Sequence, residues 1–197
     1  NEQVELEVDP IDLALLRTEP MGRIHYAANQ PRNLSAAFDF LMGRKLATLK
    51  INDPYVAANC STVDSCEELL TIFEKLWEEK PQRLIVNASD KGDLPARADA
   101  FRRMRSLLPR FCEAGGESLH IPPHGRDHHD RNIVFEFQSP APQPSKSRRG
   151  QKLKQSTASP SEAEVVTVEL SGGIDRLVRS QFETRMYVIG RTSARFS

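Results

Sequence analysis

Three residues in the run HGRDHHDRNIVFEF have the types and the spacing of a site for phosphate chemistry. His129 stands at the mouth of a predicted strand, Arg131 follows two positions later, and Glu136 lies five residues beyond Arg131. An imidazole can act as a nucleophile or general acid, and a guanidinium can bind two phosphoryl oxygens at once. Glu136 could orient an imidazole, although it is one methylene longer than Asp. The candidate catalytic residues are therefore His129, Arg131 and Glu136.

The loop before this strand also contains several side chains of metal-binding type, namely His124, Asp127, His128, His129 and Asp130. Their spacing matches no common zinc pattern, and no Cys lies nearby in the sequence. The three cysteines of the chain contain no CxxC pair, which favours reduced, mostly buried thiols of an intracellular, cytoplasmic protein. We therefore predict a solvated polar loop, with neither a metal nor a cofactor.

A second group of cations lies in residues 138–162, a segment rich in Pro and Ser with almost no apolar residues. Such a segment cannot offset its own ordering entropy, so we predict a disordered insertion between two strands. Its basic run could bind anionic lipid or nucleic acid, and a plain solvated linker is the alternative. The candidate phosphate-binding cations of this run are Lys146, Arg148 and Arg149.

Two further motifs follow predicted strands. Asp53 and Tyr55 belong to a DPY turn at the carboxyl end of a strand, where open α/β sheets place their sites. Asp53 could accept a hydrogen bond from Arg131 and position it; the alternative is a plain turn with Tyr55 packed beneath it. Gly172 and Gly173 could let backbone N–H groups approach a phosphate, or they could form an ordinary tight turn.

The elements that must position these residues alternate between strands and helices. Periodicity predicts helices over 34–41 (ending at Gly43), 61–79 and 94–113, the second with a capping box of Ser65 and Glu68. Before residue 33 we predict a strand at 4–8 and one or two helical turns at 11–17, ended by Pro20. Apolar or alternating runs predict the remaining strands, at 46–53, 83–89, 118–121, 132–137, 163–170 and 185–190.

This order predicts an α/β fold, a three-layer αβα sandwich with a mixed sheet. The first strands should be parallel because helices connect them, and the last ones partly antiparallel because their connections are short or unstructured. We divide the chain into an N-terminal extension, residues 1–32, and one domain, residues 33–197, that contains the insertion.

Length and composition set further bounds. The 197 residues suit one domain, and the formal net charge of zero argues neither for nor against nucleic acid. No apolar stretch approaches the roughly 18 residues that cross a bilayer, and no signal peptide is visible. The chain begins at Asn1 and not at Met, which favours a segment of a longer protein.

Four landmarks in order, DPY, HDR, GGID and ET, resemble the phospholipase D-like domain at the C-terminus of MIT-domain proteins. The resemblance covers about residues 33–190. His-x-Arg-x4-Glu is then a distorted form of the His-x-Lys-x4-Asp signature of phospholipase D-like phosphodiesterases. The remaining residues that match the family's motifs are Asp130, Asp175, Glu183 and Thr184. For Glu183, a salt bridge to Arg131 or Arg185 is the structural explanation that we expect.

The resemblance implies a phospholipase D-like fold with a degenerate catalytic array, and in the eukaryotic family it implies binding to membrane phosphoinositides. We therefore expect a module that binds anionic lipid headgroups or nucleic acid and acts as a recruitment or interaction domain of a larger protein or assembly. Where the ligand is lipid, it would lie peripherally at a membrane. The first alternative is a metal-independent nuclease or phosphodiesterase, as in a prokaryotic defence effector. Because this chain has one motif copy, such an enzyme would need a homodimer that pairs His129 with its symmetry mate. The second alternative is a protein–protein assembly domain.

Overall fold

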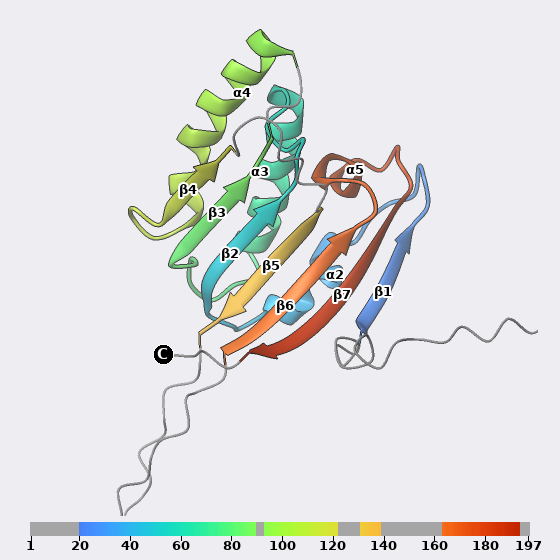
Figure 1. Ribbon diagram of the computed structural model, residues 1–197. Coiled ribbons are helices and arrows are strands. Elements are labelled where there is room, and N and C mark those ends of the chain that lie inside the picture. Colours follow the sequence, from blue (N-terminus) through green and yellow to red (C-terminus); the bar gives the residue numbers. More distant parts are fainter. Residues whose placement is uncertain (1–19, 90–92, 122–130, 139–162, 194–197) are drawn as a thin grey trace, which may run out of the picture.

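The computed structural model describes residues 20–89, 93–121, 131–138 and 163–193, and every structural statement below concerns these residues. Seven strands form a single sheet in the order β1-β7-β6-β5-β2-β3-β4 (Figure 1). The strands are β1 (Pro20–Tyr26), β2 (Leu46–Asn52), β3 (Arg83–Asn87), β4 (Glu117–His120), β5 (Asn132–Phe137), β6 (Ala163–Leu170) and β7 (Thr184–Ser193).

The sheet is mixed, as predicted. β2, β3 and β4 are parallel neighbours, whereas β5 is antiparallel to both β2 and β6, and β7 is antiparallel to β6 and β1. The parallel strands are those joined by helices, because a crossover must return the chain to the same end of the sheet. The predicted α/β class with a mixed sheet is thus confirmed.

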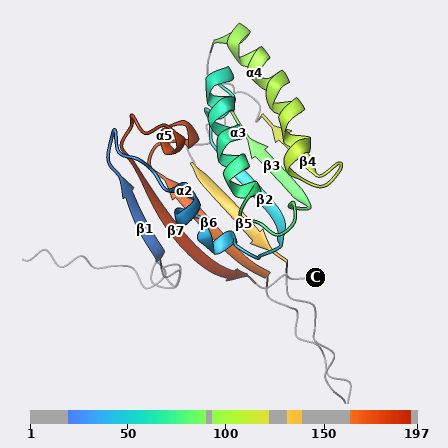
Figure 2. The ribbon, with the colours of Figure 1, turned by 180° about the vertical axis from the view of Figure 1, so that it is seen from behind.

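The helices α2 (Leu34–Ala37), α3 (Cys60–Glu74) and α4 (Leu94–Leu107) lie on one face of the sheet (Figure 2). Short α5 (Ile174–Val178) lies near the end of β6, and 3₁₀ turns follow α2 (Asp39–Leu41) and α4 (Leu108–Phe111). The described residues include no helix on the opposite face, so the second helical layer that the sequence predicted is not seen among them.

The opposite face of the sheet carries a polar row where β2 and β3 end and β5 begins. Asn52 donates from Nδ2 to Oδ1 of Asn132, and Asn87 donates from Nδ2 to Oδ1 of Asn52, each over 2.5 Å. These residues pair across β3, β2 and β5, so one row of amide side chains crosses three strands. A row of mutually bonded amides satisfies its own polar groups without an apolar layer above it.

The helical face contains the core. Phe135 of β5 lies edge-on to Phe73 of α3, with ring centroids 5.4 Å apart, and Phe73 lies 4.7 Å from Phe38. Each such aromatic pair contributes about 0.5–1.5 kcal/mol beyond the area that it buries. Two of the three cysteines are buried as predicted, while Cys60 is exposed. Burial raises the pKa of Cys66 to about 12, so its thiol is protonated at neutral pH.

The N-terminal part of the sheet lies within the predicted extension. β1 pairs with β7 from Pro20 to Tyr26, although the sequence placed residues 1–32 outside the domain. The predicted strand at 4–8 and helical turns at 11–17 lie outside the described residues. Among the described helices, none has the length and apolarity needed to cross a membrane.

The helix boundaries differ from the predictions at several ends; α2 and α4 end at Ala37 and Leu107, earlier than predicted, and each is followed by a 3₁₀ turn. The N-cap of α3 is Asn59, six residues before the predicted Ser65, because Asn59 accepts a hydrogen bond from Thr62 N and the Thr62 hydroxyl accepts one from Asn59 N. The predicted box of Ser65 and Glu68 is wrong, since Ser65 is a buried residue inside the helix. α3 also ends at Glu74, five residues earlier than predicted.

Candidate functional site

The carboxylate of Asp53 is the buried centre of the site. It follows β2 and is 2% exposed. Its Oδ1 accepts a hydrogen bond from Tyr55 N over 2.9 Å, and its Oδ2 accepts one from Ile174 N over 2.7 Å. Burial raises the pKa of Asp53, and the two N–H donors and the positive charge of Arg131 oppose part of that rise. The DPY turn is therefore tied directly to the start of α5.

Gly173 makes this tie possible. Its backbone has a positive φ of 28°, and a Cβ at this position would lie 2.7 Å from Oδ2 of Asp53. Any side chain at 173 would therefore push the carboxylate away from Ile174 N. The sequence predicted either a phosphate-approaching turn or an ordinary one, and the structure adds a different requirement, the close approach of Asp53.

Arg131 stands at the entrance to β5, and its carbonyl accepts a hydrogen bond from Leu170 N over 2.8 Å. Its guanidinium lies 5.5 Å from the centroid of the Tyr55 ring. The buried Nε of Arg131 has no hydrogen-bond partner among the described residues. The predicted hydrogen bond from Arg131 to Asp53 is absent there, and the two Asp53 oxygens accept from backbone N–H groups instead. Tyr55 is 44% exposed, so it is not packed beneath the turn as the alternative prediction required.

These residues surround a pocket of about 370 Å³. It lies where the end of β2, the start of α3, the start of β5 and the turn before α5 meet. Four of the residues predicted from motifs, Asp53, Tyr55, Arg131 and Asp175, line it together with both glycines of the GGID turn. The complete lining is Asp53, Tyr55, Val56, Thr62, Arg131, Gly172, Gly173, Asp175 and Arg176.

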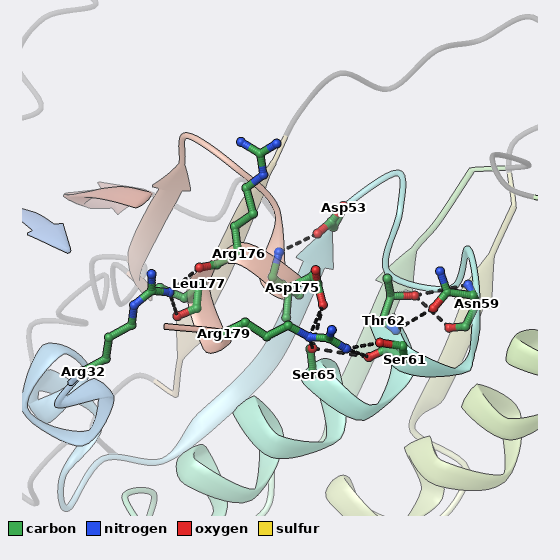
Figure 3. A network of polar contacts seen from close by, with 11 residues as sticks. Arg32, Asp53, Asn59, Ser61, Thr62, Ser65, Asp175, Arg176, Leu177 and Arg179 are labelled. Atoms are coloured by element: carbon green, nitrogen blue, oxygen red, sulfur yellow. Dashed lines mark hydrogen bonds and ion pairs between the residues drawn. The ribbon is translucent and has the colours of Figure 1, made fainter. Parts of the chain in front are cut away.

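Asp175 links α5 to α3 (Figure 3). Its Oδ1 accepts from the Ser65 hydroxyl over 2.9 Å and lies 2.7 Å from Nε of Arg179. Arg179 also donates to the Ser61 carbonyl over 3.1 Å and to the Ser61 hydroxyl. The negative charge of Asp175 is therefore matched by Arg179 at the edge of the pocket.

Glu136 lies elsewhere. It is inside β5, where it pairs with Thr48 and Val165, and it is not part of the pocket lining. Side chains alternate between the two faces of a strand, so residues five apart point to opposite faces. Arg131 lines the pocket and Glu136 does not. The predicted role of Glu136, to orient an imidazole, concerns His129, which lies outside the described residues, so it stays a prediction.

Glu183 and Thr184 belong to the scaffold of β1 and β7. The Glu183 carboxylate lies 3.0 Å from Nε2 of His25 and 3.3 Å from a guanidinium nitrogen of Arg185. The hydrogen bond from His25 is the main reason that the pKa of Glu183 is lowered. The predicted salt bridge to Arg185 is present, while Thr184 is 1% exposed with its hydroxyl unpaired among the described residues.

Several predicted residues lie outside the described part of the chain. These are His129 and Asp130 of the HDR motif, the other potential metal ligands of that loop, and the basic run of Lys146, Arg148 and Arg149. Within the described part, no group of three or more His, Cys, Asp or Glu side chains is arranged to hold a metal ion.

Comparisons with known proteins give weak likenesses. No family model and no curated protein matches the chain. A polyphosphate kinase from Porphyromonas gingivalis has a similar structure, with a TM-score of 0.46 and 11% identity over 88% of this chain and 21% of the kinase. A yeast tyrosyl-DNA phosphodiesterase gives a TM-score of 0.38 and 9% identity over 85% of this chain and 31% of the enzyme. TM-scores this low transfer no function to this chain.

The sequence did not identify Arg176, Arg179, Ser61, Ser65 or Thr62 as part of the site or its support. Of these, only Ser65 stood in a motif, the predicted capping box, and the helical periodicity of residues 61–65 gave no sign that two serines face α5. Arg176 follows the GGID motif by one residue, and this position was the one available signal.

Proposed function

We propose that this chain is a phospholipase D-like module that binds a phosphate-bearing ligand in the pocket beside Arg131. The observation that carries the proposal is the state of Arg131: its buried Nε has no partner among the described residues, and its side chain lines a pocket of about 370 Å³. A buried, unpaired guanidinium nitrogen is costly, and a phosphoryl oxygen is the acceptor whose charge and geometry suit it.

Both carboxylates of the pocket have partners other than Arg131, although the charge of Arg131 also acts on Asp53. Asp53 accepts two backbone hydrogen bonds, and Asp175 is paired with Arg179. An anionic ligand would therefore meet Arg131 without displacing an existing ion pair. The four sequence landmarks that resemble the C-terminal domain of MIT-domain proteins support the same class of ligand.

Charge reversal at Arg131 tests the proposal. We expect Arg131→Glu to abolish binding to vesicles of phosphatidylcholine with phosphatidylinositol phosphate in flotation, or to a short single-stranded oligonucleotide in a gel shift. The matched control is Arg102→Glu, which makes the same change of charge on α4, where Arg102 is 80% exposed and paired with Asp99. Unchanged binding of Arg131→Glu to every phosphate-bearing probe would remove the proposal.

In this proposal the chain is a recruitment domain of a larger cytoplasmic protein or assembly. The two probes distinguish a lipid-binding module from a nucleic-acid-binding module. Binding only to vesicles indicates a peripheral membrane module, whereas binding only to the oligonucleotide indicates a nucleic-acid module. The proposal includes the basic run of residues 146–149, whose neutralisation should lower affinity without changing the preference between the two probes.

A phosphodiesterase is the second candidate, and the open pocket at the entrance to β5 favours it. His129 precedes Arg131 by two residues, and a dimer could bring two such histidines to one phosphodiester. This enzyme would cleave an oligonucleotide in EDTA, lose activity in His129→Ala, and be dimeric by light scattering. A monomer that hydrolyses nothing excludes it.

The assembly domain, in which the motifs serve only the fold, agrees less well with the site. It requires a fully hydrogen-bonded Arg131, whereas its Nε has no partner among the described residues. Protein binding that is unaffected by Arg131→Glu, with no phosphate binding by the wild type, would favour this function.

A further inference from the structure

Arg176 is a second cation of the pocket and lies outside every motif that the sequence singled out. It is in α5, is exposed, and lines the pocket together with Arg131. The described residues give its guanidinium no ion pair or hydrogen bond; it lies 5.6 Å from the centroid of the Phe182 ring. Its positive charge is therefore available to a ligand.

Gly172 lets the side chain of Arg176 lie across the turn. A Cβ at position 172 would stand 2.5 Å from Cδ of Arg176, closer than two such atoms can approach. The two glycines of the turn thus have separate roles. Gly173 makes room for Asp53, and Gly172 makes room for the aliphatic part of Arg176.

The backbone beneath Arg176 is held on two sides. On one side Arg32 donates to the carbonyls of Arg176, Leu177 and Phe182. On the other, Arg179 and Asp175 bind the start of α3. Figure 3 shows the side chain of Arg176 extending away from Arg32. Fixing the backbone lowers the entropy that Arg176 loses on binding a ligand, because only its side chain must become ordered.

We infer that Arg176 and Arg131 together bind a terminal phosphate monoester. This inference rests on the proposed function and names the ligand class of the same pocket. A bridging phosphodiester carries one negative charge, whereas a terminal monoester carries about −1.5 to −2 at pH 7 and exposes three oxygens. Neither guanidinium forms an ion pair or hydrogen bond with a carboxylate of the described residues, and two such groups match the charge of a monoester better than the single charge of a diester.

Paired probes test the inference. The first pair is one oligonucleotide with a 5′-phosphate or a 5′-hydroxyl; the second is phosphatidylcholine vesicles with phosphatidylinositol 4-phosphate or phosphatidylinositol. We expect the wild type to prefer the monoester of at least one pair by roughly tenfold. Arg176→Gln should lose that preference while it retains the weaker, Arg131-dependent binding of the diester. The pair that shows the preference identifies the source of the phosphate.

Two further variants complete the test. Gly172→Ala should reduce the preference because its Cβ moves the side chain of Arg176, and Arg105→Gln, an equal loss of charge on exposed α4, should leave it unchanged. Equal affinity of the wild type for both members of each pair, or an unchanged preference in Arg176→Gln, overturns the inference. Neither result affects the proposed function, which fails only if Arg131→Glu binds like the wild type.

Discussion

At the scale of single residues, the contact between Gly173 and Asp53 is the most constrained feature of the site. We expect Gly173→Ala to lower the free energy of unfolding by about 2–4 kcal/mol, since its positive φ and the clash with Oδ2 of Asp53 act together. Gly22→Ala is the control: a Cβ at Gly22 meets nothing within 4 Å, so the change should stay within about 0.5 kcal/mol. Urea unfolding measures both, and equal effects would contradict the geometry.

The carboxyl of Asp53 should also give stability a defined pH dependence. Its pKa in the folded protein is raised above 3.8 by burial, so folding favours the protonated form. Its contribution is fully present below the unfolded pKa and is lost as pH rises through the folded pKa. We expect the free energy of unfolding of Asp53→Asn, relative to wild type, to increase as pH rises from about 3 to 7.

Exposed Asp39 provides the control for this measurement. Relative to wild type, Asp39→Asn should show no comparable trend in urea unfolding over the same range. A difference between Asp53→Asn and wild type that does not vary with pH would show that burial does not control this carboxyl.

At the scale of elements, the N-terminus of α3 shows that a local sequence pattern can predict the wrong cap when its serine makes a tertiary contact instead. Ser65-x-x-Glu68 fits a capping box by residue type, yet Ser65 faces Asp175 inside the fold. We expect Asn59→Ala to destabilise the protein by about 1 kcal/mol because Thr62 N loses its acceptor. Glu68→Ala should change stability by less than about 0.5 kcal/mol. Urea midpoints that rank these two variants in the reverse order would restore the predicted box.

Strand prediction succeeded where alternation or a continuous apolar run lasts for at least four residues. β5 and β6 have the predicted bounds, and β2 ends one residue before the prediction. α5 was missed because five residues are too short for helical periodicity, and its N-terminal half was read as part of a turn. β1 was missed because PMGRIHY begins with Pro20, where the predicted helical turns end, and because its apolar residues alternate little.

The site, too, could be predicted only in part: its individual residues could be predicted and their contacts could not. Asp53, Arg131 and Gly173 could be predicted individually, since each stands in a short motif at a strand end. Their contacts could not, because they come from three segments that only the sheet order brings together. Arg32 gave no signal at all, because its partners are backbone carbonyls whose positions no side-chain pattern encodes.

At the scale of the whole molecule, the structure extends the domain toward the N-terminus. β1 covers the edge of β7, and Ile24 and Tyr26 pack against the core. Arg32, which contacts Tyr26 and α5, lies in the segment that leads from β1 to α2. Partial burial lowers the pKa of this guanidinium and raises that of the Tyr26 hydroxyl.

Two shortened chains would measure this contribution, one beginning at residue 20 and the other at residue 33. The second lacks β1 and Arg32, so it exposes the edge of β7 and frees the carbonyls at the end of α5. We expect it to be less stable by about 3 kcal/mol or more in urea unfolding, and to self-associate in size-exclusion chromatography through the bare strand. Its loss of phosphate binding should follow its loss of stability, because α5 carries Arg176 and is held by Arg32. Equal unfolding midpoints for the two chains would show that the domain begins at residue 33.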